Sequence, residues 1–215
     1  MKERGMIFNG AMVRAILDGR KTQTRRPVKV PHIDRDAMCE LSGNELAGEL
    51  SAGNYRNSPH GKPGDRLWVR ETWARYNIDQ DSHDMAYRAT PPADWPEEGR
   101  WRPSIHMPRW ASRILLEITG VRVERLNSIS DADCIAEGII PVPKDRDDDH
   151  QFWRDYHLSG DGTFCVHSPR ESFESLWKSV RGKSFEQEED TGPGSWHANP
   201  WVWVIEFKRV EEAAQ

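Results

Sequence analysis

The stretch "NGAMVRAILDGRKTQTRRPV", residues 9–28, predicts a helix, a sharp stop and a strand in immediate succession. Apolar residues recur at helical spacing through residues 12–17. Asn9 can cap the start of this helix, and Gly19 can adopt the left-handed conformation that ends one. The following residues include β-branched threonines, and Pro27 disfavours helix at the residue before it. We therefore expect a short helix that feeds directly into a strand.

Three further segments have the alternation that is typical of strands. They are residues 62–74, 113–126 and 199–210. The second of these segments contains Gly120, where a bend is expected. In the last segment, alternate large apolar residues from Trp201 to Phe207 share one face, which predicts a half-buried strand.

Two more short helices are expected, at residues 128–139 and 168–180. Each opens with a serine followed three residues later by an acidic residue, as in a capping box, and Gly138 can end the first helix. Long polar stretches separate the elements, and we interpret them as insertions. They are residues 31–63, 77–110 and 143–167. Together these patterns predict an α+β fold in a single domain spanning residues 1–215.

Composition excludes several classes of protein. The chain has 215 residues, and its ten tryptophans are too many for a disordered segment although 30% of the residues are charged. It has no run of 18 apolar residues and no recognisable leader peptide, so we expect a cytoplasmic protein that does not enter a membrane. Three cysteines without CxxC spacing and scattered histidines predict neither a disulfide framework nor a metal site, and no cofactor is expected.

The order of these elements resembles that of the ASCH domain, a member of the PUA-like superfamily of small mixed β-barrels. The residues that carry the resemblance are Gly19, Lys21, Thr24 and Arg26, a "GD" turn at residues 64–65, the "SxxD…EG" helix near residue 130 and the "VIEF" ending at residues 204–207. The resemblance as a whole covers about half of the chain, in five blocks separated by the polar insertions. The resemblance implies a PUA-like mixed β-barrel with short flanking helices and long loop insertions. Within the family, the chain is similar to bacterial N(4)-acetylcytidine amidohydrolases, and its insertions resemble those of longer prophage and bacteriophage members.

This resemblance implies a catalytic triad of Lys21, Thr24 and Glu137. A threonine hydroxyl is a weak nucleophile that needs a base, and a lysine is a base only when burial or neighbouring positive charge keeps it neutral. Lys21 must lie in the turn before the strand to approach Thr24, and we expect it at a loop mouth outside the core. A carboxylate at a helix C-terminus, as expected for Glu137, holds its proton more readily and suits a general acid.

Three further residues are candidates for substrate binding. Arg26 shares a strand face with Thr24 and could hold a carbonyl or a phosphate, or make a surface ion pair. Glu71 could accept a hydrogen bond from a base amine, and Trp73 could stack on a base. Packing inside the barrel is the alternative role for Trp73.

Two functions remain open on the sequence alone. One is an amidohydrolase that removes an acyl group from the exocyclic amine of a cytosine nucleoside, and the net charge of −5 favours such a small substrate over a long polyanion. The other is a module that binds RNA, or a ribonuclease. Five lysines and arginines between Arg20 and Lys29 favour this second function, because they could grip phosphates.

Overall fold

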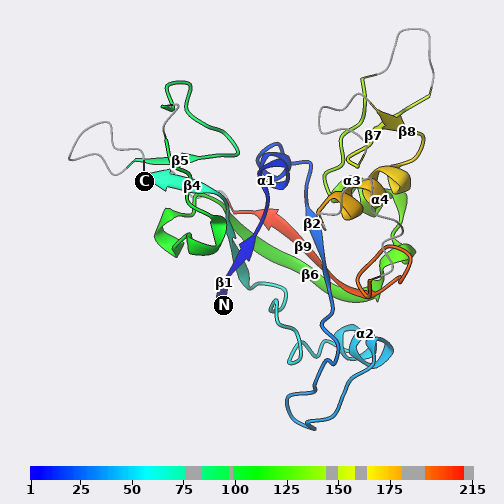
Figure 1. Cartoon of the computed structure of the whole chain (residues 1–215). Helices are drawn as coiled ribbons and strands as arrows, with labels where there is room; N and C mark the ends of the chain where they lie inside the picture. The colour runs from blue at the N-terminus through cyan, green and yellow to red at the C-terminus, as the bar shows by residue number, and fades with distance from the viewer. Residues whose placement is uncertain (76–83, 97–98, 144–149, 158–163, 181–191, 211–215) are drawn as a thin grey trace.

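A mixed sheet of five strands organises the chain, with the short helices at its ends and over its faces (Figure 1). The structure is a computed structural model that describes residues 1–75, 84–96, 99–143, 150–157, 164–180 and 192–210. Across the sheet the strands are β1 (Glu3–Ile7), β3 (Arg66–Arg70), β6 (Leu115–Arg125), β9 (Trp201–Arg209) and β2 (Gln23–Pro27). The outer pair β1 and β3 is parallel, and the other neighbours are antiparallel.

Helices and two small sheets complete the α+β fold. The helices are α1 (Gly10–Leu17), α2 (Gly43–Ser51), α3 (Asp131–Ala136) and α4 (Pro169–Val180), with 3-10 turns η1 (Ser104–His106), η2 (Arg109–Ala111) and η3 (Leu126–Ser128). One small sheet pairs β4 (Trp73–Arg75) with β5 (Met85–Tyr87), and the other pairs β7 (Trp153–Arg154) with β8 (Cys165–Val166). None of the helices in the described ranges is long and apolar enough to cross a membrane.

The predicted helix, stop and strand at residues 9–28 are confirmed. Asn9 caps α1 by accepting a hydrogen bond from the backbone nitrogen of Met12 at 2.9 Å. Gly19 has φ +74°, as a left-handed helix stop requires. The bend expected in the long strand is also present, because the pairing of β6 with β9 shifts register at Gly120.

The prediction that the last strand is half-buried is wrong, because β9 is covered on both faces. Trp203, Ile205 and Phe207 lie in the main core, as their shared face predicts. Val202 and Val204 on the opposite face are 0% exposed and pack in a second core with residues of α3 and α4. The reason is that β9 runs between β6 and β2, and α3 and α4 cover its second face.

The stretch at residues 31–63 is more than a polar insertion, since it contains α2. Leu46 and Leu50 project from α2 into the main core, and Ser42 forms a reciprocal capping box with Glu45. The described parts of residues 77–110 contain β5, η1 and η2, and those of residues 143–167 contain β7 and β8. The remainder of these two stretches, residues 77–83, 97–98, 144–149 and 158–163, lies outside the described residues.

The sheet is open but strongly coiled. Among the described residues β1 and β2 form no ladder with each other, so no closed barrel is present. Strands four positions apart in a flat sheet would lie about 19 Å from each other. Nevertheless Arg26 of β2 donates a hydrogen bond from Nη2 to the backbone oxygen of Ile7 in β1 at 2.6 Å. A single side chain therefore spans the gap between the two edge strands.

Candidate active site

The turn that follows α1 is fastened to the C-terminal end of α3. The backbone nitrogen of Thr22 donates a hydrogen bond to the carbonyl oxygen of Ala136 at 2.9 Å. The carbonyl oxygen of Thr22 accepts one from the backbone nitrogen of Phe207 in β9 at 2.8 Å. The backbone nitrogen of Lys21 donates to the carbonyl oxygen of Ala15 at 3.0 Å. Lys21 thus lies in the turn before β2, as the sequence predicts. Glu137 is the C-cap of α3, also as predicted.

These backbone contacts bring Lys21 and Glu137 together. Lys21 Nζ donates to Glu137 Oε2 at 2.6 Å and to the backbone oxygen of Glu137 at 2.8 Å. The side chains of the two residues are 0% and 3% exposed. The expectation that Lys21 lies at a loop mouth outside the core is therefore wrong, since the amine is enclosed between α1, α3 and β2.

Gly138 makes this close approach possible. Its φ is +89°, and a Cβ atom at this position would lie 2.9 Å from the Cβ atoms of both Ala15 and Lys21. Any larger residue would push the Lys21 turn away from α3. The glycine that ends the helix thus also sets the distance between the amine and the carboxylate.

Arg25, one of the basic residues between Arg20 and Lys29, is also part of the site. It is 4% exposed, and its Nη1 donates to Glu137 Oε1 at 3.1 Å. Its Nη2 contacts Glu124 at 2.6 Å and Asp133 at 3.3 Å. The signal in the sequence is the alternation along β2, which places Gln23 and Arg25 on the face toward α3, the same side on which Lys21 meets Glu137.

Burial controls the charge of the amine. Removal from water lowers the pKa of Lys21 and is the largest influence on it. The Glu137 carboxylate opposes this effect, while the positive charges of Arg26 and Arg25 lower the pKa further. The net pKa of Lys21 lies below the ordinary value of a lysine, which is the direction that a lysine base requires.

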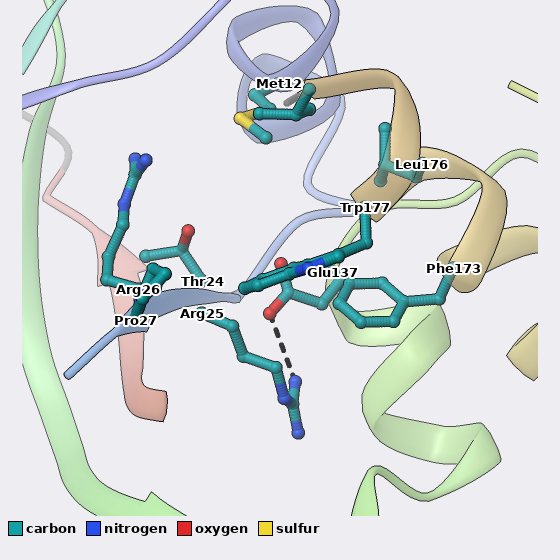
Figure 2. A pocket seen from close by; sticks show the side chains of 10 residues that line it. Met12, Thr24, Arg25, Arg26, Pro27, Glu137, Phe173, Leu176 and Trp177 are labelled. Atoms are coloured by element: carbon teal, nitrogen blue, oxygen red, sulfur yellow. Dashed lines mark hydrogen bonds and ion pairs between the residues drawn. The ribbon is translucent and has the colours of Figure 1, made fainter. Parts of the chain in front are cut away.

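A pocket with about 550 Å³ of empty space opens beside this pair (Figure 2). Thr24 and Glu137 line its polar side, and Figure 2 shows that Phe173 and Trp177 of α4 supply aromatic rings from the other side. Thr24 is 1% exposed, and its hydroxyl makes no hydrogen bond to the residues that the structure describes. Both hydrogen bonds of the Lys21 amine go to Glu137, and Glu137 is the member of this pair that lines the pocket.

The three predicted binding residues lie in different places. Arg26 lines the pocket beside Thr24, and its guanidinium lies over the ring of Phe8 at 5.4 Å. The structure does not bring Glu71 or Trp73 into this pocket. Glu71 is held by Arg113 through two hydrogen bonds of 2.9 and 3.0 Å.

Trp73 packs inside a small core of its own. It is 2% exposed and lies with Met107 and Ala111, while Arg102 is 5.3 Å from the centre of its ring. Trp73 therefore has a packing role, as the alternative to base stacking predicts, but it packs in this separate core and not inside a barrel.

No group of three or more potential metal ligands is present among the described residues. Comparison with known proteins finds no matching family model, no matching curated protein and no matching solved structure. The function must therefore be argued from the site itself and from the motif "GRKTQTR".

Proposed function

We propose that the protein is an amidohydrolase that removes the acyl group from the exocyclic amine of N(4)-acetylcytidine or a related acylated nucleoside. The observation that carries this proposal is the buried pair of Lys21 and Glu137 beside Thr24, whose hydroxyl has no hydrogen-bond partner in the described part of the chain. The motif that resembles the ASCH amidohydrolases thus supplies three adjacent groups of the required chemistry: a nucleophile, a base and an acid.

The reaction begins with attack of Thr24 Oγ1 on the acyl carbon. The hydroxyl proton passes to the neutral amine of Lys21 by way of the Glu137 carboxyl group, which lines the pocket with Thr24 and is hydrogen-bonded to the amine. The C–N bond then breaks, and a proton from Glu137 goes to the departing exocyclic amine. Water hydrolyses the resulting threonine ester, and the acid product leaves. Atoms balance, because one water is consumed and one carboxylic acid and one cytidine are released.

Lys21 and Glu137 can exchange the protons of this reaction because both side chains are buried and the distance between Nζ and Oε2 is short. In one arrangement Lys21 is an ammonium and Glu137 a carboxylate, and in the other the amine and the carboxyl group are both neutral. The two arrangements have the same net charge, so proton transfer across the 2.6 Å contact converts one into the other. Burial lowers the pKa of Lys21, so the neutral amine that the reaction requires is more accessible here than in an exposed lysine.

Helix α4 shapes the substrate side of the pocket. Phe173, Leu176 and Trp177 form an apolar wall opposite Thr24. The indole nitrogen of Trp177 donates to the carbonyl oxygen of Gly194 at 3.1 Å, which fixes the orientation of the ring. A flat pyrimidine or an acyl group can pack against such a wall.

We also propose that the coiled sheet is an open form of the PUA-like barrel. The hydrogen bond from Arg26 to Ile7 across the two edges supports this assignment, because it joins the strands that a closed barrel would pair.

RNA binding or RNA cleavage is the second candidate, and the basic segment at residues 20–29 favours it on sequence alone. However, intramolecular carboxylates already bind Arg20, Lys21 and Arg25. Of the five basic residues, only Arg26 and Lys29 have no carboxylate partner among the described residues. A grip on phosphates by the whole segment is therefore less well supported than hydrolysis.

The decisive experiment is incubation of the purified protein with N(4)-acetylcytidine, followed by chromatographic detection of cytidine and acetate. We expect both products from the wild type and neither from Thr24→Val. Tight RNA binding together with intact acetylcytidine would instead favour the second candidate.

A further inference from the structure

A second cavity lies on the other side of Arg26, between the edge strands β1 and β2. We call it the edge groove, and it contains about 1500 Å³ of space that is open to solvent. Residues that characterise its lining are Met6, Arg26, Lys29, His60, Arg70 and Trp203. Arg26 and Pro27 line both this groove and the pocket that contains Thr24. The two spaces are therefore neighbours.

The edge groove is positively charged although the whole chain carries −5. Arg26, Lys29 and Arg70 contribute three cations, and no acidic residue is among the described residues that line it. The guanidinium of Arg70 donates to the backbone oxygens of Ser104 and Ile105, so a neutral carbonyl rather than a carboxylate fixes it in place. These positive charges remain available to an anion.

The floor of the groove is aromatic. Trp203 makes edge contacts with His32 and His60, each at 5.7 Å between ring centres. Burial, with the positive charges of Arg26 and Arg4, lowers the pKa of His60 to about 4. His60 is thus neutral near pH 7 and can offer a ring N–H without adding charge, while the cations attract the anion.

We propose that the edge groove binds the phosphate of a cytidine nucleotide whose base enters the pocket beside Thr24. Thr24 and Arg26 are alternate residues on one face of β2, so their Cα atoms lie about 7 Å apart. Arg26 lines both spaces, so a nucleotide that extends from Thr24 into the groove passes along its side chain. The preferred substrate is then a phosphorylated acylcytidine, either a mononucleotide or a residue of RNA, and the free nucleoside is a weaker one. The identity of the base rests on the proposed function, whereas the phosphate site rests on the groove.

Calorimetric binding of cytidine, 5′-cytidine monophosphate and a short oligocytidylate tests this proposal. We expect the monophosphate to bind at least about tenfold more tightly than cytidine, because hydrogen bonds to a charged group are among the stronger ones. Lys29→Ala and Arg70→Gln should each remove most of this advantage while leaving cytidine binding unchanged. Lys208→Ala is the matched control, since Lys208 is exposed, pairs with Glu117 and lies outside the groove.

The measurement with oligocytidylate distinguishes a mononucleotide ligand from RNA. If the oligocytidylate binds no more tightly than the monophosphate, the site recognises one phosphate of a mononucleotide. A higher affinity that falls steeply with salt identifies RNA. Two results would contradict phosphate binding in the edge groove. One is equal affinity for cytidine and its monophosphate, and the other is equal affinity of the two groove variants and the wild type for the monophosphate. Groove-dependent binding without hydrolysis of any acylated ligand would instead overturn the amidohydrolase and leave the groove in place.

Discussion

Lys21 Nζ lies 2.6 Å from Glu137 Oε2, although 116 positions separate the two residues in the chain. Both side chains are buried, so the pair is held away from water by α1, α3 and β2. An ion pair in such a place contributes little net stability, because desolvation opposes the attraction between the charges. We propose that the pair has a catalytic role in addition to a structural one, and variants of Lys21 and Glu137 separate these two roles.

Lys21→Met removes the amine while it keeps an apolar stem of similar length. We expect loss of hydrolysis and a fall of about 3 kcal/mol in the free energy of unfolding, since one partner of a buried pair is removed. Urea unfolding and product release measure the two effects. In the double variant Lys21→Met/Glu137→Gln, stability should fall by less than the sum of the two single changes, whereas activity should stay absent. Full activity of Lys21→Met would exclude a base role.

Thr24→Val replaces the proposed nucleophile with a side chain of the same shape. Its hydroxyl makes no hydrogen bond to the described residues, so the free energy of unfolding should change by less than about 1 kcal/mol. Hydrolysis should nevertheless disappear, and Thr24→Ser should retain part of it. Mass spectrometry of the wild type during turnover should detect an acylated Thr24. A valine variant that still releases cytidine would show that the hydroxyl is not the nucleophile.

Glu137→Gln tests the proton donor through the pH dependence of turnover. The wild type should follow a bell-shaped profile, because the active pair holds one proton fewer than its fully protonated form and one more than its deprotonated form. The two limbs belong to the coupled pair rather than to either residue. Gln cannot titrate, so at least about 100-fold of the activity should be lost, and the alkaline limb should vanish from the remainder. An unchanged profile would assign Glu137 a structural role only.

The pH dependence of stability tests the lowered pKa of Lys21. Since this pKa is lower in the folded protein than in the unfolded chain, the unfolded state binds more protons at pH values between the folded and the unfolded pKa. Within that window the contribution of Lys21 to the unfolding free energy must rise with pH, by at most about 1.4 kcal/mol per unit. The stability difference between the wild type and Lys21→Met, measured by urea unfolding at pH 8, 9 and 10, should show this slope. A difference that is constant or falls with pH would contradict it.

Gly138→Ala tests whether backbone geometry sets the Lys21 position. The new Cβ would meet Ala15 and Lys21 at 2.9 Å from a backbone with φ +89°, so we expect a loss of about 1–3 kcal/mol and a fall in turnover. Gly48→Ala in α2 is the matched control, because a Cβ there meets nothing within 4 Å. It should stabilise the helix by about 0.5–1 kcal/mol and leave turnover unchanged. Equal effects of the two substitutions would exclude a special role for Gly138.

Much of the framework follows from local patterns in the sequence. Asn9 and Gly19 define the ends of α1, and the alternation of residues 199–210 predicts β9, because capping and strand periodicity depend on neighbours within a few positions. The same local logic places Lys21 in a turn and Glu137 at a helix end. The sequence pattern does not predict helix α2, because two leucines in a short polar segment give too weak a periodic signal.

Tertiary structure alone decided the environment of these residues. The sequence predicts one buried face for β9, but α3 and α4 cover the second, which also encloses the site. In the sequence Lys21 resembles an exposed basic residue, but Gly138 and the C-terminal end of α3 enclose it in the fold. Arg25 becomes part of the site through its contacts with Glu137, Glu124 and Asp133. Burial and long-range ion pairing depend on contacts between residues more than 90 positions apart, which no local pattern of side chains encodes.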